Sequence, residues 1–395
     1  MKKLLLATTI LAAMSTAALA ADIKLGIILG FTGPIESLTP GMADGAELAW
    51  KEASDSGMLL GGSKIISVRG DSTCIDSAAA TAVAERQITS DNVAAIMGAD
   101  CSGVTGAVAN NVAVANGVVM ISPSATSPAL SALDDKGFFF RTAPSDARQG
   151  QVLAEIVTER GIKNVAITYT NNDYGKGLDE AFSASFKKLG GTIAISAAHE
   201  DGKGDYSAEV AALAASGAKD LVVFGYVDQG GKGIIQSSLD TGAFERFIFA
   251  DGMVGQALVD AFGNDVMGSF GSGPGSDVDG IAKFHAIAKG TVAGDGKGPF
   301  DGNSYDAGAL IVLAMQAAGS ADRAAIQSKV MDVANAPGEK IYPGELAKAL
   351  KIIKDGGDVD YQGATGVEFN EIGEVFGSYK ELEIDGKQFV TVKLR

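Results

Sequence analysis

Short apolar runs alternate with helical stretches along the chain from Ile23 onward. Four runs precede Arg141, namely "IKLGIILG", "KIISVRG", "VAAIMGA" and "VVMIS", and four follow it, namely "VAITYT", "TIAISAA", "LVVFGY" and "FIFADG". They are apolar along their length rather than alternating, which is typical of strands covered on both faces. Repeated strand–helix–strand units predict parallel, doubly wound α/β sheets. Because the series occurs twice, we expect two similar lobes.

Apolar residues at helical spacing mark the helices between these strands. The expected buried faces comprise Met42, Ala46, Ala49, Trp50 and Ala53 in one helix, and Leu178, Phe182, Phe186 and Leu189 in another, which Gly190 ends. Further helices are expected around "SYDAGALIVLAMQAAG" and "PGELAKALKII". The last strands are expected at "GVEFN" and "FVTVKLR".

The lobes are expected to be joined by a three-segment hinge. One seam lies near "FFFRTAPSDARQG", and the Gly-rich "GSFGSGPGSD" marks a second crossing near residue 274. The expected lobes are residues 21–143 with 275–372, and residues 144–274 with 373–395. About 375 residues remain beyond the first 20, which is more than one hydrophobic core usually serves.

Residues 1–20 have the pattern of a secretory signal peptide. Lys2 and Lys3 precede the apolar stretch "LLLATTILAAMS", and Ala18-Leu19-Ala20 is an A-x-A cleavage signal. The apolar stretch is too short for a membrane span, and no cysteine follows the cleavage site to carry a lipid. We therefore expect a soluble, exported protein, cleaved after Ala20, in the periplasm.

The charge balance is strongly acidic. The 395 residues carry 48 acidic and 32 basic side chains, a formal net charge of −16, and loss of Lys2 and Lys3 would leave −18. Such a chain is repelled by nucleic acid and by anionic lipid, so neither is expected as a partner. A hydrophobic content of 46% argues against disorder.

Cys74 and Cys101 are the two cysteines of the chain. In an oxidising compartment such a pair indicates one disulfide, worth roughly 3 kcal/mol for a loop of 26 intervening residues. Two buried free thiols are the alternative, and the export signal favours the disulfide.

Motifs for bond-making chemistry do not stand out. The two histidines, His199 and His285, belong to no metal or nucleophile motif, and we interpret both as solvated surface residues. Around "GGKG" the pattern of a phosphate-binding loop fails, because Gly231 and Lys232 are out of register and no Ser or Thr follows the lysine. We therefore expect no catalytic residue, no metal and no cofactor.

Small polar residues fill the loops that follow the strands. In open α/β sheets, ligands bind at the carboxyl ends of strands, where helix N-termini favour anions. "GADCSGVTGAV" places Ser102 there, and "MISPSATSPAL" places Ser124 and Thr126 at the next such loop. Their hydroxyls can bind a carboxylate or an ammonium group without carrying charge. A plain helix N-cap is the alternative role for each of them.

A series of motifs in one order carries a family resemblance. The series is "GFTGP" with "DGAELAWKEA", then "CSGVT", "MISPSATSP", "FFFRTAPSDARQG", "NNDYGKGL", "GDYSAEVAAL" and "ATGVEFNEIGEV". The chain resembles the periplasmic leucine/isoleucine/valine-binding proteins of ABC transporters, which have the type I periplasmic binding fold. The resemblance covers almost all of the chain after the signal peptide.

The resemblance implies an amino-acid site on the first lobe. Ser102 would bind the α-carboxylate of the ligand through its hydroxyl and backbone N–H. Ser124, Ala125 and Thr126 would form the adjoining contact stretch, which offers backbone groups and a hydroxyl to the carboxylate and the ammonium. Cys101 lies beside the site, where its pairing with Cys74 would match the disulfide of the family.

The resemblance also implies a cover from the second lobe. Tyr174 in "NNDYGKG" and Tyr226 in "VVFGYVD" would close over the ligand. Asp251 in "FADGM" falls where the family carries an acid that pairs with the α-ammonium. The alternatives are loop packing for the tyrosines and a turn residue before Gly252 for the acid. Neutral donors on one lobe and an acid on the other supply the opposite fields that a zwitterion needs in a dry cleft.

Three departures from the pattern of the family bear on the side chain of the ligand. Leu38 stands where the family has a pocket aromatic, and we expect it to contact the ligand. Glu36 stands where leucine binders are usually uncharged, and Asp251 is shorter than the glutamate of the best-known members. A roomier pocket, or a ligand with another polar group, would fit these changes.

The sequence therefore predicts a non-enzymatic solute-binding protein. It would capture a neutral, aliphatic or branched-chain L-amino acid between two lobes by hinge closure and deliver it to an inner-membrane ABC permease. The protein is expected to be a monomer. The alternatives are the same fold binding an amide, urea, an aromatic acid or γ-aminobutyrate, the same fold as a ligand sensor, and a hydrolase, for which no base is visible beside Ser102.

Overall fold

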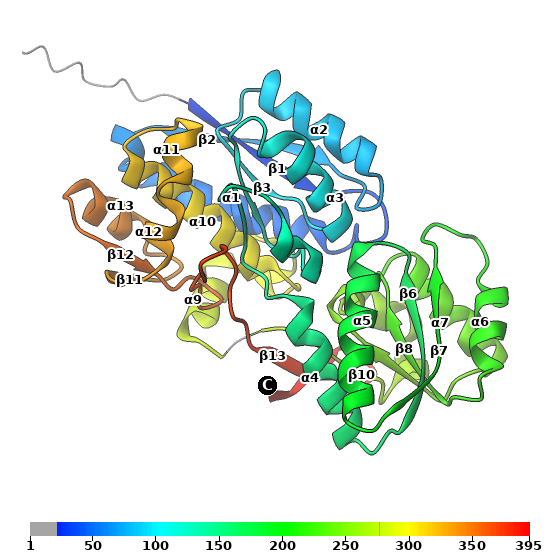
Figure 1. The fold of residues 1–395 in the computed structure, drawn as a ribbon. Helices are drawn as coiled ribbons and strands as arrows, with labels where there is room; N and C mark the ends of the chain where they lie inside the picture. Colours follow the sequence, from blue (N-terminus) through cyan, green and yellow to red (C-terminus); the bar gives the residue numbers. More distant parts are fainter. Residues whose placement is uncertain (1–21, 276) are drawn as a thin grey trace, which may run out of the picture.

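Two α/β lobes make up the computed structural model, which describes residues 22–275 and 277–395. Figure 1 shows one lobe around the blue-to-teal strands and the other around the green strands. The predicted signal peptide, residues 1–20, lies outside the described residues. In the described part of the chain, every helix is too short or too polar to cross a membrane.

The first sheet has five parallel strands in the order β2-β1-β3-β4-β5. Its strands are β1 (Asp22–Leu29), β2 (Lys64–Asp71), β3 (Ala95–Gly98), β4 (Val119–Ser122) and β5 (Phe139–Arg141). This is the flavodoxin-like order, in which ligands bind beyond the carboxyl ends of the strands at the β1/β3 switch point.

The second sheet repeats this order with two strands added, as β14-β13-β10-β9-β8-β6-β7. Its strands are β6 (Asn164–Thr170), β7 (Thr192–His199), β8 (Asp220–Phe224), β9 (Arg246–Phe249), β10 (Phe270–Pro274), β13 (Tyr379–Ile384) and β14 (Phe389–Leu394). The strands β6 to β10 are parallel, whereas β13 and β14 pair antiparallel. The predicted fold class, two similar doubly wound lobes, is confirmed.

Helices connect the strands and cover both sheets. The helices up to β10 are α1 (Thr39–Asp55), α2 (Ser77–Thr89), α3 (Ser102–Val108), α4 (Asp146–Glu159), α5 (Asp173–Lys188), α6 (Ser207–Ala214), α7 (Gly230–Thr241) and α8 (Gln256–Phe262). After β10 the chain returns to the first lobe, as Figure 1 shows. It forms there α9 (Asp279–Ala288), α10 (Asp301–Ala318), α11 (Arg323–Gln327), α12 (Val330–Ala334), α13 (Leu346–Lys354) and a ladder of β11 (Glu339–Ile341) and β12 (Val359–Tyr361).

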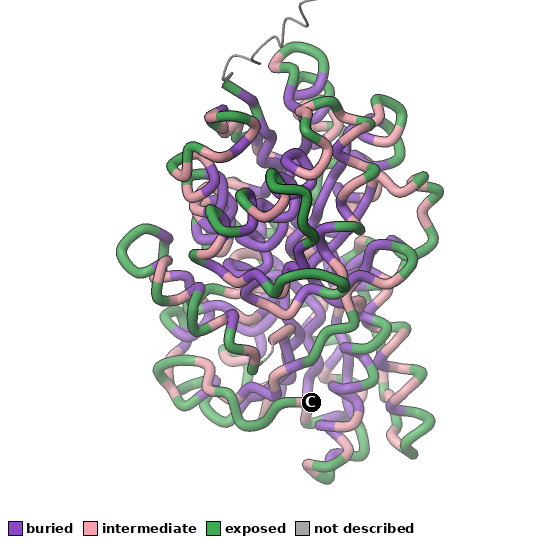
Figure 2. The backbone as a smooth tube through the Cα atoms, turned by 90° about the vertical axis from the view of Figure 1, so that its left-hand side faces the viewer, coloured by how far each residue is buried: buried purple, intermediate pink, exposed green. Residues whose placement is uncertain are grey.

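The chain passes between the sheets three times, after β5, after β10 and before β13. The predicted lobe boundaries, after residues 143, 274 and 372, stay a prediction. Figure 2 shows the buried backbone running through the middle of both lobes, with exposed loops around it.

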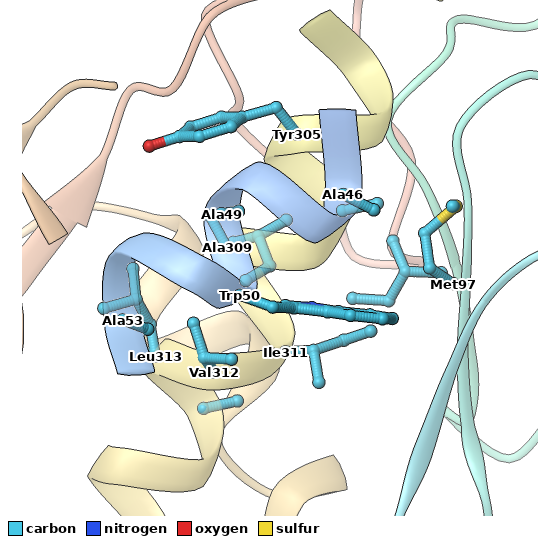
Figure 3. Close-up of a cluster of buried hydrophobic side chains, with 14 of the residues drawn as sticks. Ala46, Ala49, Trp50, Ala53, Met97, Tyr305, Ala309, Ile311, Val312 and Leu313 are labelled. Carbon is cyan, nitrogen blue, oxygen red and sulfur yellow. The ribbon is translucent and has the colours of Figure 1, made fainter. Parts of the chain in front are cut away.

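The core of the first lobe forms where α1 packs against α10. The predicted face of α1 is confirmed, since its alanines, Met42 and Trp50 are all buried. Trp50 lies flat among residues of both helices (Figure 3), and its indole N–H donates to the Gly308 carbonyl at 3.1 Å. Small residues such as Ala46 and Gly308 let the two helices approach closely.

Two predicted strands differ from the expectation that both faces are covered. β2 and β7 alternate between more exposed and more buried residues, because each is the edge strand of its sheet. The predicted strand at "GVEFN" is also wrong. Phe369 forms only an isolated bridge to Val375, because the chain turns back at once between Asn370 and Gly373.

Two further expectations are corrected by burial. Leu189 is 43% exposed, because α5 ends at Lys188 and the residue after it no longer faces the core. His199 is not solvated: it is buried at the end of β7, and its Nδ1 lies 2.8 Å from the Thr168 hydroxyl. Burial lowers the pKa of His199 to about 4, so its ring is neutral at neutral pH.

Trp50→Ala is expected to lower the free energy of unfolding by about 3–5 kcal/mol, because it leaves a large cavity between α1 and α10. Trp50→Phe should cost clearly less, since most of the volume stays filled. Urea unfolding followed by far-UV circular dichroism measures both, because Trp50 is the single tryptophan and its fluorescence is lost. Equal midpoints for Trp50→Ala and the unchanged protein would contradict this packing account.

Candidate ligand-binding cleft

A small cavity lies between the lobes, at the carboxyl ends of the strands. Seven of the nine predicted contact residues line it: Leu38, Cys101, Ser102, Ser124, Tyr174, Tyr226 and Asp251. The other two, Ala125 and Thr126, are fully buried behind the wall of the cavity. That these residues contact a ligand stays a prediction, but the fold brings them together from six separate segments, which follow β1, β3, β4, β6, β8 and β9.

The first-lobe wall is organised by a buried acid that the sequence analysis missed. The carboxylate of Asp100 accepts from the Gly30 N–H at 2.5 Å, the Ser72 hydroxyl at 3.1 Å and the Cys101 N–H at 2.9 Å. These groups follow β1, β2 and β3, so one carboxylate fixes three loops at the switch point. Burial raises the pKa of Asp100, and the three hydrogen bonds oppose that rise.

A disulfide joins the same loops, as predicted, between Cys74 and Cys101. Cys101 precedes Ser102, the first residue of α3. The Ser102 Oγ accepts from the Ser127 N–H at 3.1 Å, which leaves its own hydroxyl hydrogen to donate. Ser102 can therefore offer a neutral donor to a group in the cavity.

The hydroxyls of "MISPSATSPAL" have distinct partners. Ser122 donates to the Ala99 carbonyl at 2.5 Å, and Ser124 donates to the Asp100 carbonyl at 3.1 Å. Ser127 reaches the other lobe and donates to the Asp173 carbonyl at 3.0 Å. Only the Thr126 hydroxyl has no hydrogen-bond partner among the described residues. Three of the four hydroxyls of this loop therefore hold it in place.

Arg141 holds this loop from behind. Its guanidinium is fully buried and donates to the Ala125 carbonyl at 3.2 Å and the Ser127 carbonyl at 2.9 Å. It also pairs with Glu374 at 2.7 Å. The arginine is the last residue of β5, so the strand that carries the chain toward the second lobe also fixes the loop at the cavity.

The second-lobe wall is two tyrosines and an acid. The rings of Tyr174 and Tyr226 stack with centroids 5.1 Å apart. The Tyr174 hydroxyl donates to Asp251 at 2.9 Å and accepts from the Gly252 N–H at 3.0 Å. All three side chains are buried, so Asp251 is an acid in a site with little water.

A second acid, Asp146, lies behind Asp251 and was missed by the sequence analysis. It is fully buried at the start of α4, and neither carboxyl oxygen has a hydrogen-bond partner among the described residues. Burial, and then the charge of Asp251, raise the pKa of Asp146 well above its usual range, against the opposing effects of Thr126 and Arg141. Burial raises the pKa of Asp251 to about 6. The two acids are thus buried close together, where the charged form of each is disfavoured.

Four apolar side chains also line the cavity, those of Ile35, Leu38, Met42 and Phe300. Phe300 comes from just before α10, some 260 residues after Leu38, and local sequence patterns gave no signal for it. Glu36 is exposed and is not among the lining residues, so its charge does not enter the cavity.

Known proteins of similar sequence identify the family of the chain. The chain matches the family described as periplasmic binding protein over residues 22–340. The chain belongs to this family. The Leu/Ile/Val-binding protein homolog 3 of Brucella melitensis is 28% identical over 317 residues, covering 79% of this chain and 83% of that protein. An amino acid binding protein of Pseudomonas aeruginosa is 31% identical, covering 72% and 76%.

Solved structures agree on the periplasmic binding protein fold. A leucine binding protein from Thermotoga maritima superposes with a TM-score of 0.77 at 22% identity, covering 94% of this chain and 98% of that one. A solute binding protein from R. palustris in complex with 4-hydroxybenzoate also has a TM-score of 0.77, at 19% identity, covering 95% and 97%. At 22% and 19% identity, these two likenesses show the fold alone. The two solved proteins are also described with different ligands, leucine and 4-hydroxybenzoate.

Acidification is expected to stabilise the ligand-free binding protein. The pKa of Asp251 rises from 3.8 to about 6 on folding, so the folded state holds more protons than the unfolded state between these values. Stability from this group therefore rises as pH falls from about 6 to about 4, by up to about 3 kcal/mol. Buried Asp306 and Asp301, with pKa values raised to about 6 and about 7, act in the same direction.

Thermal unfolding of ligand-free protein between about pH 6.5 and about pH 4 measures this effect. Over the same range buried His199, with its pKa lowered to about 4, acts in the opposite direction, so the comparison with the Asp251 variant isolates the acid. The melting temperature should rise on acidification, and Asp251→Asn should reduce the rise. Asp260→Asn, at an exposed position on α8, is the control and should leave it unchanged. A rise of equal size in Asp251→Asn would show that the titrating groups lie elsewhere.

Arg141→Met is expected to destabilise the first lobe by about 3–5 kcal/mol, because Glu374 and two loop carbonyls lose their partner in the interior. Arg141→Met with Glu374→Gln should recover part of the loss, since the unpaired charge is gone. Thermal unfolding by circular dichroism compares the two variants. Equal loss in both would mean that the ion pair contributes nothing.

Proposed function

We propose that the protein is a periplasmic solute-binding protein that captures a neutral aliphatic L-amino acid, most simply a branched-chain one, and delivers it to an ABC permease of the inner membrane. One observation carries the proposal: neutral donors of the first lobe, a buried acid of the second lobe and apolar side chains all line one small cavity. This is the charge pattern of a zwitterion with a hydrocarbon side chain.

The head group would bridge the two lobes. Its carboxylate would take the hydroxyl of Ser102 and donors of the loop at Ser124, while its ammonium would pair with Asp251. Asp146 is buried close to Asp251 and to the Thr126 hydroxyl. Charge-assisted hydrogen bonds of this kind are strong when water is excluded. The role of each residue is part of the proposal.

The side chain of the ligand would lie against Ile35, Leu38, Met42 and Phe300. The cavity is small and is lined by side chains of both lobes, which suits one amino acid and not a peptide. Relatives named for leucine, isoleucine and valine support the same ligand class.

Ligand binding would favour the closed form, because the head group contacts both lobes only when they meet. The hinge would be the three crossings of the chain, with lobes at residues 21–143 with 275–372 and 144–274 with 373–395. Export, cleavage after Ala20 and a monomeric state complete the proposal. The acidic protein would dock on basic permease loops. The same capture would also serve a ligand sensor.

An aromatic acid is the second candidate ligand, because a solved relative is a complex with 4-hydroxybenzoate. The stacked rings of Tyr174 and Tyr226 would suit an aromatic ring. Such a ligand has a carboxylate and no ammonium. It would leave Asp251 and Asp146 buried together without a cation, which is costly. The acid pair therefore favours the amino acid.

Isothermal titration calorimetry tests the proposal on protein that has been unfolded and refolded to remove carried ligand. L-leucine, L-isoleucine and L-valine should bind, whereas 4-hydroxybenzoate, urea and γ-aminobutyrate should not. Asp251→Asn should weaken L-leucine binding by about 2–4 kcal/mol, because a buried ammonium loses its charged partner. The control Asp260→Asn should bind normally. Binding of 4-hydroxybenzoate alone would replace the proposed ligand with an aromatic acid.

A further inference from the structure

The loop between β1 and α1 makes two reciprocal hydrogen bonds to the second lobe. The Ser37 N–H donates to the Asp228 carboxylate at 2.8 Å, and the Asp228 N–H donates to the Pro34 carbonyl at 2.9 Å. Asp228 follows Tyr226 by two residues, so the contact lies next to the aromatic wall of the cleft. Asp228 of the second lobe is thus hydrogen-bonded to both ends of the four-residue segment 34–37 of the first lobe.

The same turn forms part of the cavity wall. Its Ile35 and Leu38 line the cavity, and the Leu38 N–H donates to the Ile35 carbonyl at 2.9 Å. Leu38 also reaches the second lobe, since a Cβ at Gly255 would lie 3.1 Å from its Cδ2. Leu38 accordingly packs against the cores of both lobes. The backbone between Ile35 and Leu38 faces Asp228, while their side chains face the ligand space.

The base of the turn is fixed to the first lobe. Thr32 donates to Asp71, at the end of β2, through its hydroxyl at 2.6 Å. Gly33 has φ of +106° and lies so close to Thr73 that a Cβ would come within 2.5 Å of the Thr73 carbonyl oxygen. Because the base of the turn is fixed, we expect a displacement of Leu38 to change the hydrogen bonds between the turn and Asp228.

We propose that Asp228 and the turn Pro34–Leu38 form an interlobe clasp that makes closure depend on the size of the side chain of the ligand. The inference rests on the proposed function, since it needs a ligand between the lobes. A side chain that fits leaves Leu38 against Gly255 and the clasp closed. A larger one displaces Leu38 and the turn, and the bonds to Asp228 open. Asp228 is then a positioning residue that determines residence time and size selection without touching the ligand.

Stopped-flow displacement of L-leucine tests the clasp in Asp228→Ala, with Glu36→Ala as the matched control. Glu36 belongs to the same turn, and its loss removes the same charge, but its side chain makes none of the clasp bonds. Asp228→Ala should raise the dissociation rate about five-fold, with the association rate within about two-fold of the unchanged protein. Glu36→Ala should change neither rate.

Selectivity for the size of the ligand is a second measurement, and a general loss of stability would not change it. The ratio of the dissociation constants for L-phenylalanine and L-leucine should fall in Asp228→Ala, because the relaxed turn yields to the larger side chain. Equal rates and equal ratios in both variants and the unchanged protein would overturn the clasp while leaving the proposed function intact.

Failure of the unchanged protein to bind L-leucine would overturn the proposed function instead. Amide hydrogen exchange of the segment 33–39 in ligand-free protein then decides the clasp alone. Faster exchange in Asp228→Ala than in Glu36→Ala supports the clasp, because the Ser37 N–H has lost its acceptor. Equal exchange overturns it.

Discussion

The buried carboxyl groups of Asp251 and Asp146 are the constraint on which the rest of the cleft depends. Two acids close together out of water disfavour the charged form of each other, and burial adds to the effect. The nearby Arg141 lowers the pKa of Asp146, but its hydrogen bonds go to backbone carbonyls, Ser131 and Glu374. A ligand that brings its own ammonium therefore gains more here than at a solvated acid. The cleft favours such a ligand by leaving its own acids incompletely paired.

The first lobe contributes neutral hydrogen-bond donors on loops that are held in place by buried charges. Asp100 fixes the loops after three strands, and Arg141 fixes the loop that follows the fourth. Both charges are engaged within the protein, Asp100 by two backbone N–H groups and Ser72, and Arg141 by two backbone carbonyls, Ser131 and Glu374. Preorganised donors of this kind lose little entropy when a ligand arrives. In the proposed function, specificity for a zwitterion would come from the contrast between the two lobes, which closure would bring together.

The sequence predicted what local patterns encode. Apolar runs gave the doubly wound sheets, helical spacing gave the face of α1 around Trp50, and the export signal favoured the Cys74–Cys101 disulfide. The exposure of β2 and β7 was not predicted, because it depends on their positions at the edges of the sheets and not on their composition. β13 was missed because its Glu381 looks solvated, whereas ion pairs with Arg160 and Arg395 bury it. Asp146 in "PSDARQG" has the appearance of an ordinary first-turn acid, and only the tertiary approach of Asp251 makes it unusual.

A crystal structure of the refolded protein with L-leucine near neutral pH tests the central claim most directly. The account predicts the ligand ammonium within about 3 Å of an Asp251 carboxylate oxygen, on the side where Asp146 lies, with the ligand carboxylate against Ser102. A ligand whose ammonium lies away from both acids, or one bound outside the cavity between the lobes, would contradict it.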